Sequence, residues 1–243
     1  MRSFRKASPF EFFLSKKVGK AIADYSMLKD KDRILVGISG GKDSLACLDV
    51  LSRRRSFVPI DYTLVAVCIN EALSKSYLAK LKKYMDKEGY EFHVIKSDIS
   101  LRKNKKGDFD CFWCAWNRRK ALFNAAEKFH CKKIALGHNK DDIAQTLLMN
   151  IFFAGEISIM SPMQEMFKGR LHIIRPMAYV EEKDLARYAK INHLPVCQAK
   201  CPNASKNNRQ LMKKIIKSVE KVFPNVKSNI LGSTKRIRKD YLF

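Results

Sequence analysis

The stretch "ILVGISGGKDSLACL", residues 34–48, constrains the fold more than any other part of the chain. Its first five residues are apolar or small, as in a buried parallel strand. A glycine turn, Ser39–Ser44, leads from them directly into a pattern in which apolar residues recur at helical spacing. A strand joined so tightly to a helix is the building unit of a doubly wound α/β sheet. Ligands bind such sheets beyond the carboxyl ends of the strands, so we expect the turn to lie in a binding site.

The same alternation of strand and helix patterns continues along the chain. Apolar runs at 63–69 and 133–137, and a shorter one at 91–95, predict further buried strands. Apolar residues at helical spacing predict helices over 44–54, 74–88, 115–129 and 140–153. We therefore expect an α/β fold with a doubly wound, mostly parallel sheet.

Helical additions flank this predicted core. One helix is expected over 18–28 and another over 208–223. The packing face of the second is predicted to consist of Leu211, Ile215, Val219 and Val222. The expected organisation is a basic N-terminal helical segment at 1–29, a central domain at 30–200 and a basic C-terminal helical segment at 201–243.

The turn has the chemistry of a phosphate site. Gly40 and Gly41 lack a Cβ, so the backbone can approach a ligand closely while the helix N-terminus presents free N–H groups to an anion. Lys42 adds a mobile positive charge, and Asp43 suits a Mg²⁺ ion or a catalytic proton. The turn also offers hydroxyl donors at Ser39 and Ser44. The sequence matches neither G-x-x-x-x-G-K-[ST] nor G-x-G-x-x-G, which excludes the two commoner nucleotide loops.

The charge of the chain indicates a polyanionic partner. Lys and Arg number 48 against 24 Asp and Glu, a formal net charge of +24. The excess is concentrated in 1–20, 102–106 and 201–243. This clustering favours nucleic acid over a membrane surface and over a merely solvated lysine-rich surface. Apolar runs long enough for a membrane span or a secretory signal are absent from the sequence, so we expect a cytoplasmic protein.

Seven cysteines without a secretory signal favour thiols, metal ligands or redox groups over disulfides. Cys111 and Cys114 form a Cys-x-x-Cys pair at a helix start, and Cys197 and Cys201 form a second close pair. The spacing allows a structural zinc held by four thiolates, a cluster held by three, or plain buried cysteines. The remaining cysteines are assigned to the core: Cys47, Cys68 and Cys131.

Two resemblances narrow these alternatives. SGGKDS resembles the PP-loop of the N-type ATP pyrophosphatases, adenine nucleotide alpha hydrolase-like enzymes that cleave ATP to AMP and pyrophosphate and activate a carbonyl oxygen as an adenylate. Over residues 18–210 the chain further resembles the tRNA 2-thiocytidine synthetases. The segments that carry this second resemblance are "AIADYSMLKDKDRILVGISGGKDS", "CFWCAWNRRKALF", "KIALGHNKDDIAQTLLMNIFFAG" and "IIRPMAYVEEKDLARYAK".

The second resemblance implies a 4Fe-4S cluster held by three cysteines, with one iron free to carry sulfur. The matching ligands here are Cys111, Cys114 and Cys201. Cys201 is preferred to Cys197 because it stands at the family's distance before the Arg-Gln pair at 209–210.

The resemblance also implies nucleotide contacts in "GHNKDD", residues 137–142, which matches the family's Gly-His-His-Arg-Asp-Asp. Gly137 is expected beside the nucleotide, with His138 as a positioning group. Asp142 is the first candidate for Mg²⁺ or ATP, and Asp141 the second.

The implied reaction is ATP-dependent tRNA thiolation in a PP-loop ATP pyrophosphatase domain with an iron–sulfur site, residues 30–200. ATP·Mg²⁺ at Ser39–Ser44 adenylates a cytidine C2 carbonyl, with Lys42 and Asp43 as catalytic groups, and sulfur displaces AMP. The expected partners are tRNA and a sulfur donor, either a cysteine desulfurase persulfide or inorganic sulfide, with a homodimer as one oligomeric state. Aromatic residues near the cysteines are assigned to packing, with base stacking as the alternative: Phe112, Trp113 and Trp116.

Three other functions stay open. A uridine thiolase would share the loop, but its relatives usually carry zinc-binding Cys pairs at their ends, which this sequence does not contain. A lysidine-type ligase would need no Cys triad. A zinc-stapled RNA-binding protein would need no ATP loop.

Overall fold

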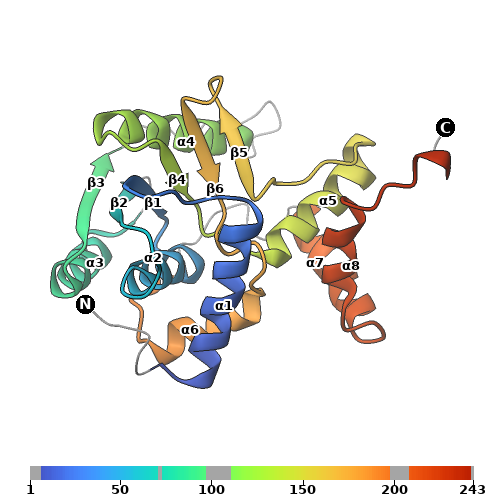
Figure 1. Ribbon diagram of the computed structural model, residues 1–243, viewed down its shortest axis with the longest axis horizontal. Helices are drawn as coiled ribbons and strands as arrows, with labels where there is room; N and C mark the ends of the chain where they lie inside the picture. The colour runs from blue at the N-terminus through green and yellow to red at the C-terminus, as the bar shows by residue number, and fades with distance from the viewer. Residues whose placement is uncertain (1–6, 71–72, 97–110, 198–207, 242–243) are drawn as a thin grey trace.

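A computed structural model of the chain describes residues 7–70, 73–96, 111–197 and 208–241. In these residues six strands form one sheet in the order β3-β2-β1-β4-β6-β5 (Figure 1). Neighbouring strands are parallel except for β5 and β6, which pair antiparallel at one edge. The bounds are β1 (Asp32–Ile38), β2 (Tyr62–Asn70), β3 (Glu91–Lys96), β4 (Lys133–Ala135), β5 (Met163–Met166) and β6 (Leu171–Ile174). The predicted doubly wound, mostly parallel α/β sheet is confirmed.

Helices cover both faces of the sheet because successive strand residues point to opposite sides. In β1, Leu35 packs with Leu122 and Ala125 of α4 (Cys111–Lys128) on one face. Ile34 and Val36 belong to the larger core on the other face. That core is covered by α1 (Pro9–Asp24), α2 (Lys42–Arg54), α3 (Lys75–Glu88) and α6 (Glu182–Ile191).

The C-terminal helices lie beside the sheet and not over it. In Figure 1, α7 (Asn208–Glu220) and α8 (Val226–Ser233) stand against α5 (Lys140–Ala154), and a short 3-10 turn, η2 (Lys239–Tyr241), follows them. The predicted packing face of α7 is wrong, since Leu211, Ile215 and Val219 are exposed and Val222 lies beyond the helix end. Met212 and Ile216 are buried in their place.

The face of α7 that docks follows a spacing of three and four residues, but it mixes apolar and charged positions. Arg209 pairs with Asp142 of α5, and Lys213 pairs with Glu182 of α6. Both cations lie on the same face of α7 as the buried Met212 and Ile216. A hydrophobic pattern alone therefore selects the wrong face.

The predicted strands and helices are otherwise found within a few residues. The N-terminal helix is displaced: it begins at Pro9 and not near 18, because Ser8 caps it and pairs with Glu11 in a capping box. Among the described residues, five elements lack a sequence-based prediction: β5, β6, α6, α8 and η2. The divisions at 29/30 and 200/201 stay a prediction. Among the described residues, no helix is long and apolar enough to cross a membrane.

The strand order reverses between β1 and β4. From β1 the chain continues through α2 to β2 and β3 on one side, while β4 leads through α5 to β5 and β6 on the other. Such a switch point leaves a crevice at the carboxyl ends of the two central strands. The N-termini of α2 and α5 both begin there, which places the SGGKDS loop and the GHNKDD segment side by side.

Candidate functional site

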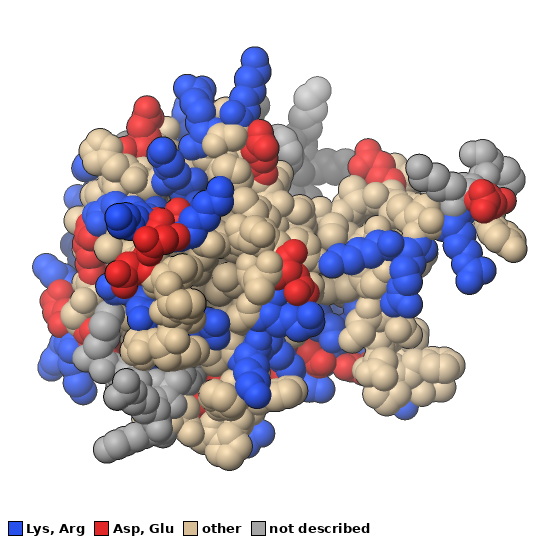
Figure 2. Space-filling view, in the orientation of Figure 1, with Lys and Arg blue, Asp and Glu red and all other residues tan. Residues whose placement is uncertain are grey.

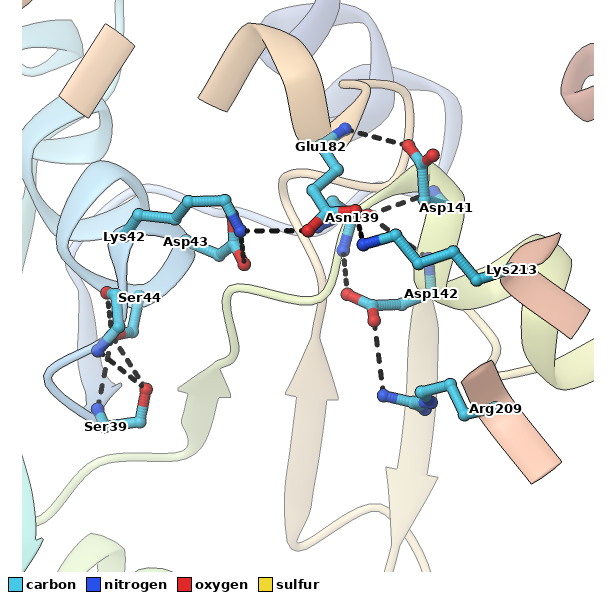
Figure 3. Close-up of polar contacts among 11 residues, drawn as sticks. Ser39, Lys42, Asp43, Ser44, Asn139, Asp141, Asp142, Glu182, Arg209 and Lys213 are labelled. Carbon is cyan, nitrogen blue, oxygen red and sulfur yellow. Dashed lines mark hydrogen bonds and ion pairs between the residues drawn. The ribbon is translucent and has the colours of Figure 1, made fainter. Parts of the chain in front are cut away.

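The SGGKDS loop (Ser39–Ser44) joins β1 to α2 and is closed by its own hydroxyl groups. Ser44 Oγ donates to Gly41 O at 3.0 Å and accepts from the Ser39 N–H at 3.2 Å (Figure 3). Gly40 has a φ of +81°, a conformation that L side chains rarely adopt. Within the described residues no side chain caps the N-terminus of α2 at Gly41. Its N–H groups and positive dipole are thus available to an anion.

The loop is held from outside by contacts that the sequence did not reveal. Tyr77 Oη of α3 lies 2.7 Å from Pro195 O and 3.2 Å from Gly40 O. The Cys197 N–H donates to the same Gly40 carbonyl at 2.8 Å. The segment after α6 therefore ends against the loop, four residues before Cys201.

Gly137 brings the second segment into direct contact with the loop. A Cβ at this position would lie 2.7 Å from the carbonyl carbon and oxygen of Asp43 and from the Ser44 nitrogen. Only glycine permits so close an approach of two backbones. Gly137 therefore lies directly against the loop, while its contact with a nucleotide stays a prediction.

Connected ion pairs link the loop to α6 and α7 (Figure 3). Lys42 Nζ lies 3.1 Å from Asp43 Oδ2 and 3.2 Å from Glu182 Oε1, and Lys213 Nζ lies 2.6 Å from Glu182 Oε2. Burial, and to a smaller extent the charges of Asp142 and Glu182, raise the pKa of Asp43 to about 6 although Lys42 opposes them. Glu182 and Lys213 were not predicted, because only the fold brings them to the loop.

Asp43 has the features of a cation ligand. Its Oδ1 is buried and has no hydrogen-bond partner among the described residues. A buried carboxylate oxygen without a partner is rare in folded proteins and costs free energy. A divalent cation such as Mg²⁺ prefers carboxylate oxygens and would compensate this group.

Asp142 lies in the first turn of α5, close enough to Asp43 for its charge to raise the pKa of that carboxyl. Asn139 caps this helix by accepting from the Asp141 and Asp142 N–H groups, and Asp142 Oδ2 accepts in return from the Asn139 N–H at 3.0 Å. Asp142 Oδ1 lies 3.3 Å from Arg209 Nη1 on α7. The Asp142 carboxylate is thus fixed in orientation, and its second oxygen points to a surface arginine that a ligand could displace.

Both carboxylate oxygens of Asp141 have partners within the protein. Its Oδ1 pairs with Lys227 Nζ at 2.8 Å, and its Oδ2 accepts from the Glu182 N–H at 2.8 Å. Lys227 is buried and also lies 3.0 Å from Glu220 Oε1 and 3.6 Å from Glu181 Oε2. These bonds tie α5, α6, α7 and α8 together, which supports Asp142 over Asp141 as the ligand.

His138 lies against a buried arginine that sequence analysis did not single out. Arg175 Nε donates to His138 Nδ1 at 3.3 Å, and its other nitrogens bond Ser161 O and, at 3.4 Å, Gln164 Oε1. Burial and then Arg175 lower the pKa of His138 to about 4, so the ring is neutral and its proton lies on Nε2. Arg175 is only 5% exposed, and its hydrogen-bond partners among the described residues are all uncharged.

Of the three cysteines predicted as cluster ligands, the structure describes only Cys114 in full. Cys114 lies in the first turn of α4, partly exposed, with Arg118 Nη2 at 3.8 Å from its Sγ. Cys111 shares that turn, but its side chain and the whole of Cys201 lie outside the described residues. The assignment of these ligands stays a prediction. The three cysteines expected in the core are buried: Cys47, Cys68 and Cys131.

Comparison with known proteins agrees with this geometry. The PP-loop domain family matches residues 12–219. A tRNA-cytidine(32) 2-sulfurtransferase of Geobacter sulfurreducens is 36% identical over 230 residues, 93% of this chain and 90% of the relative. One of Burkholderia multivorans is also 36% identical, over 93% of this chain and 70% of the relative. The solved U34-tRNA thiolase NcsA of Methanococcus maripaludis, with its [4Fe-4S] cluster, shares the fold at a TM-score of 0.77 with 24% identity, over 93% of this chain and 78% of that one.

The uncapped loop at a sheet switch point, together with the domain match, defines the class: this is a PP-loop protein of the ATP-binding kind. Within that class, the identity and coverage of its relatives show that the chain belongs to the tRNA-cytidine(32) 2-sulfurtransferase family.

Proposed function

We propose that the protein is an ATP-dependent tRNA sulfurtransferase that converts a cytidine to 2-thiocytidine, as its relatives' name states for them. The observation that carries the proposal is the hydrogen bond from the Cys197 N–H to Gly40 O, at 2.8 Å. It joins the segment leading to the last cysteine to the loop that would hold ATP. Activation and sulfur delivery would thus meet at one edge of the sheet.

The activation step follows from the loop and the two aspartates. The α2 N-terminus and Lys42 would bind the departing pyrophosphate and stabilise its developing charge. Asp43 and Asp142 would hold Mg²⁺, and the unpaired Oδ1 of Asp43 supports this assignment. The cytosine O2 attacks the α-phosphorus of ATP, and pyrophosphate leaves. Sulfur at the oxidation level of sulfide then bonds to C2 while the C2–O bond breaks, and the oxygen leaves with AMP.

His138 would assist at the base or the nucleotide as a neutral donor. Its Nδ1 accepts from Arg175, so its Nε2–H is the free donor. A neutral imidazole N–H can donate a hydrogen bond to an oxygen that gains negative charge, and the ring need not lose a proton first. The two neighbouring arginines, Arg175 and Arg209, keep the site positive for the phosphate groups that enter it.

The donor set fits an iron–sulfur cluster. Cys111 and Cys114 are three residues apart in the first turn of α4, a spacing that places the two positions on one face of a helix. We propose them as ligands together with Cys201, which follows the loop-bound Cys197 by four residues. A 4Fe-4S cluster held by these three thiolates would supply an iron free to hold sulfur.

The remaining partners follow from charge and surface. The net charge of +24 and the Lys and Arg side chains spread over one face in Figure 2 support tRNA as the substrate of a cytoplasmic enzyme. The sulfur donor would be a cysteine desulfurase persulfide or inorganic sulfide. The exposed apolar stripe on α7, formed by Leu211, Ile215 and Val219, supports a homodimer that would cover it.

The test is the thionucleoside product formed by anaerobically purified, reconstituted protein. With ATP, Mg²⁺, sulfide and unmodified tRNA, nucleoside mass spectrometry should find 2-thiocytidine, with AMP formed in equal amount. A 2-thiouridine product would point to the uridine thiolase, and lysidine formed with added lysine would point to the ligase. Zinc in all four paired cysteines without ATP-dependent labelling would leave an RNA-binding protein.

Ligand choice is tested separately by two serine variants. Cys201→Ser should lose the iron–sulfur absorbance, and Cys197→Ser should keep it, because Cys197 contacts the loop through its backbone. The opposite pattern would reverse the assignment of the third ligand.

A further inference from the structure

The outer side of α4 carries both tryptophans of the chain as a stacked pair. The ring centroids of Trp113 and Trp116 are 5.9 Å apart, and their planes differ by 22°. Trp116 is 46% exposed, and Lys120 Nζ lies 5.5 Å from its ring centroid. Trp113 stacks against Trp116, and among the described residues Lys120 is the cation that lies over the Trp116 ring.

The charge around the pair indicates the chemistry of a partner. Trp116 is followed closely by three exposed cations at 118–120, and α4 contains no acidic residue before Glu127. An aromatic ring beside a group of cations can stack on a nucleobase and bind the adjoining phosphate. A partner with an acidic surface alone would use the cations and leave the tryptophan ring without a role.

The pair also lies near the candidate site. α4 follows the parallel strand β3, so its first turn, with Cys111 and Cys114, begins at the carboxyl edge of the sheet. Arg119, one turn after Trp116, is near enough to His138 and Arg175 to lower the pKa of both. An RNA whose target base enters the site would therefore have its neighbouring nucleotides within reach of this side of α4.

We propose that Trp116, supported by Trp113, is a stacking platform for an unpaired base of the RNA substrate, with Lys120 moving from the ring to the adjoining phosphate. This proposal rests on the proposed RNA substrate. Every base has a stackable face, so the platform would hold single-stranded RNA without reading its sequence. A continuous duplex keeps its base faces inside its own stack and would not use it.

The two tryptophans are a built-in optical probe of this contact. Trp113→Phe leaves Trp116 as the sole tryptophan, and its fluorescence is followed while an anticodon stem-loop RNA, or a fully paired duplex of equal length, is added at fixed salt. We expect quenching by the stem-loop and little by the duplex. Trp116→Ala should weaken stem-loop binding about tenfold, within the range measured for loss of one stacked base, and Trp116→Phe should restore most of it.

The matched control is Phe57→Ala. Phe57 is equally exposed, at 49%, and lies under an arginine, Arg54, but it follows the C-terminal end of α2 at the opposite edge of the sheet. Its loss should leave RNA affinity unchanged. Equal weakening by Phe57→Ala and Trp116→Ala, equal quenching by duplex, or quenching that depends on protein concentration without RNA would each overturn the proposal.

The outcome is independent of the enzyme assay. ATP-dependent thiolation without quenching of Trp116 would refute the platform and leave the proposed function intact. Quenching by the stem-loop without any ATP-dependent thiolation would support the platform and refute the proposed function.

Discussion

Replacing Lys227 with methionine should be among the most destabilising single substitutions at buried positions of the C-terminal region. Lys227 is 8% exposed in its side chain and lies within 3.6 Å of three carboxylates, those of Asp141, Glu181 and Glu220. Removing one partner of a buried ion pair leaves uncompensated charge and costs about 3–5 kcal/mol. In a protein of this size that corresponds to a fall in melting temperature of roughly 6–20 °C.

Lys183→Met is the matched control, because Lys183 pairs with the same Glu181 at 3.0 Å but is 72% exposed. An exposed pair contributes at most about 1 kcal/mol, so the two variants should differ by several degrees in thermal unfolding. Equal stability of Lys227→Met and Lys183→Met would refute the assignment of Lys227 as a buried tie between α8 and the site.

The pH dependence of this difference has a defined sign. Burial raises the pKa of Glu181, but Lys183, Lys227 and Lys140 more than offset that effect and hold the pKa below its usual 4.5. A carboxylate with a lowered folded pKa contributes stability above its unfolded pKa, and this contribution is lost as the pH falls through the folded value. The difference in the free energy of unfolding between the wild type and Lys227→Met should therefore become smaller below about pH 4.5.

Three further predictions concern the site and the surface. Gly137→Ala places a Cβ 2.7 Å from the Asp43 backbone, so the two segments must part to reach an ordinary 3.4 Å contact. ATP affinity measured by calorimetry should then fall at least about tenfold, and unchanged affinity would contradict the contact. The pKa of His138 is about 4 in the folded protein, against an ordinary value of 6.5, so the unfolded chain takes up this proton at a higher pH than the folded protein does. The protein should therefore lose stability as the pH falls from about 6.5 to about 4. That loss, up to about 3 kcal/mol in urea unfolding, should be missing in His138→Gln. Leu211→Glu should shift the protein from dimer to monomer in analytical sedimentation without changing ATP affinity. A wild-type protein that sediments as a monomer would refute the proposed homodimer.

The sheet and the nucleotide loop could be predicted from sequence because their signals are local. An apolar run, two glycines and a helical repeat occupy adjacent positions at 34–48, and no distant contact is needed to interpret them. β5 and β6 were missed because each has only four residues, so neither gives a long apolar run; β5 is also only half-buried, at the edge of the sheet.

The parts of the site that sequence did not predict come from distant segments. Tyr77 and Glu182 reach the loop from α3 and α6, and Arg175, just after β6, contacts His138; their local sequence carries no nucleotide motif. The packing face of α7 was misassigned for a related reason. That helix docks partly through Arg209 and Lys213, whose partners are known only when the chain is folded.

The fate of the cytidine oxygen tests the central claim most directly. A tRNA carrying oxygen-18 at the cytidine C2 position is incubated with the reconstituted protein, ATP, Mg²⁺ and sulfide, and the released AMP is analysed by mass spectrometry. If ATP bound at Ser39–Ser44 adenylates that oxygen, the heavy isotope appears in AMP in equal amount to the 2-thiocytidine formed. Unlabelled AMP beside thiolated tRNA, or label in pyrophosphate or water, would contradict the account.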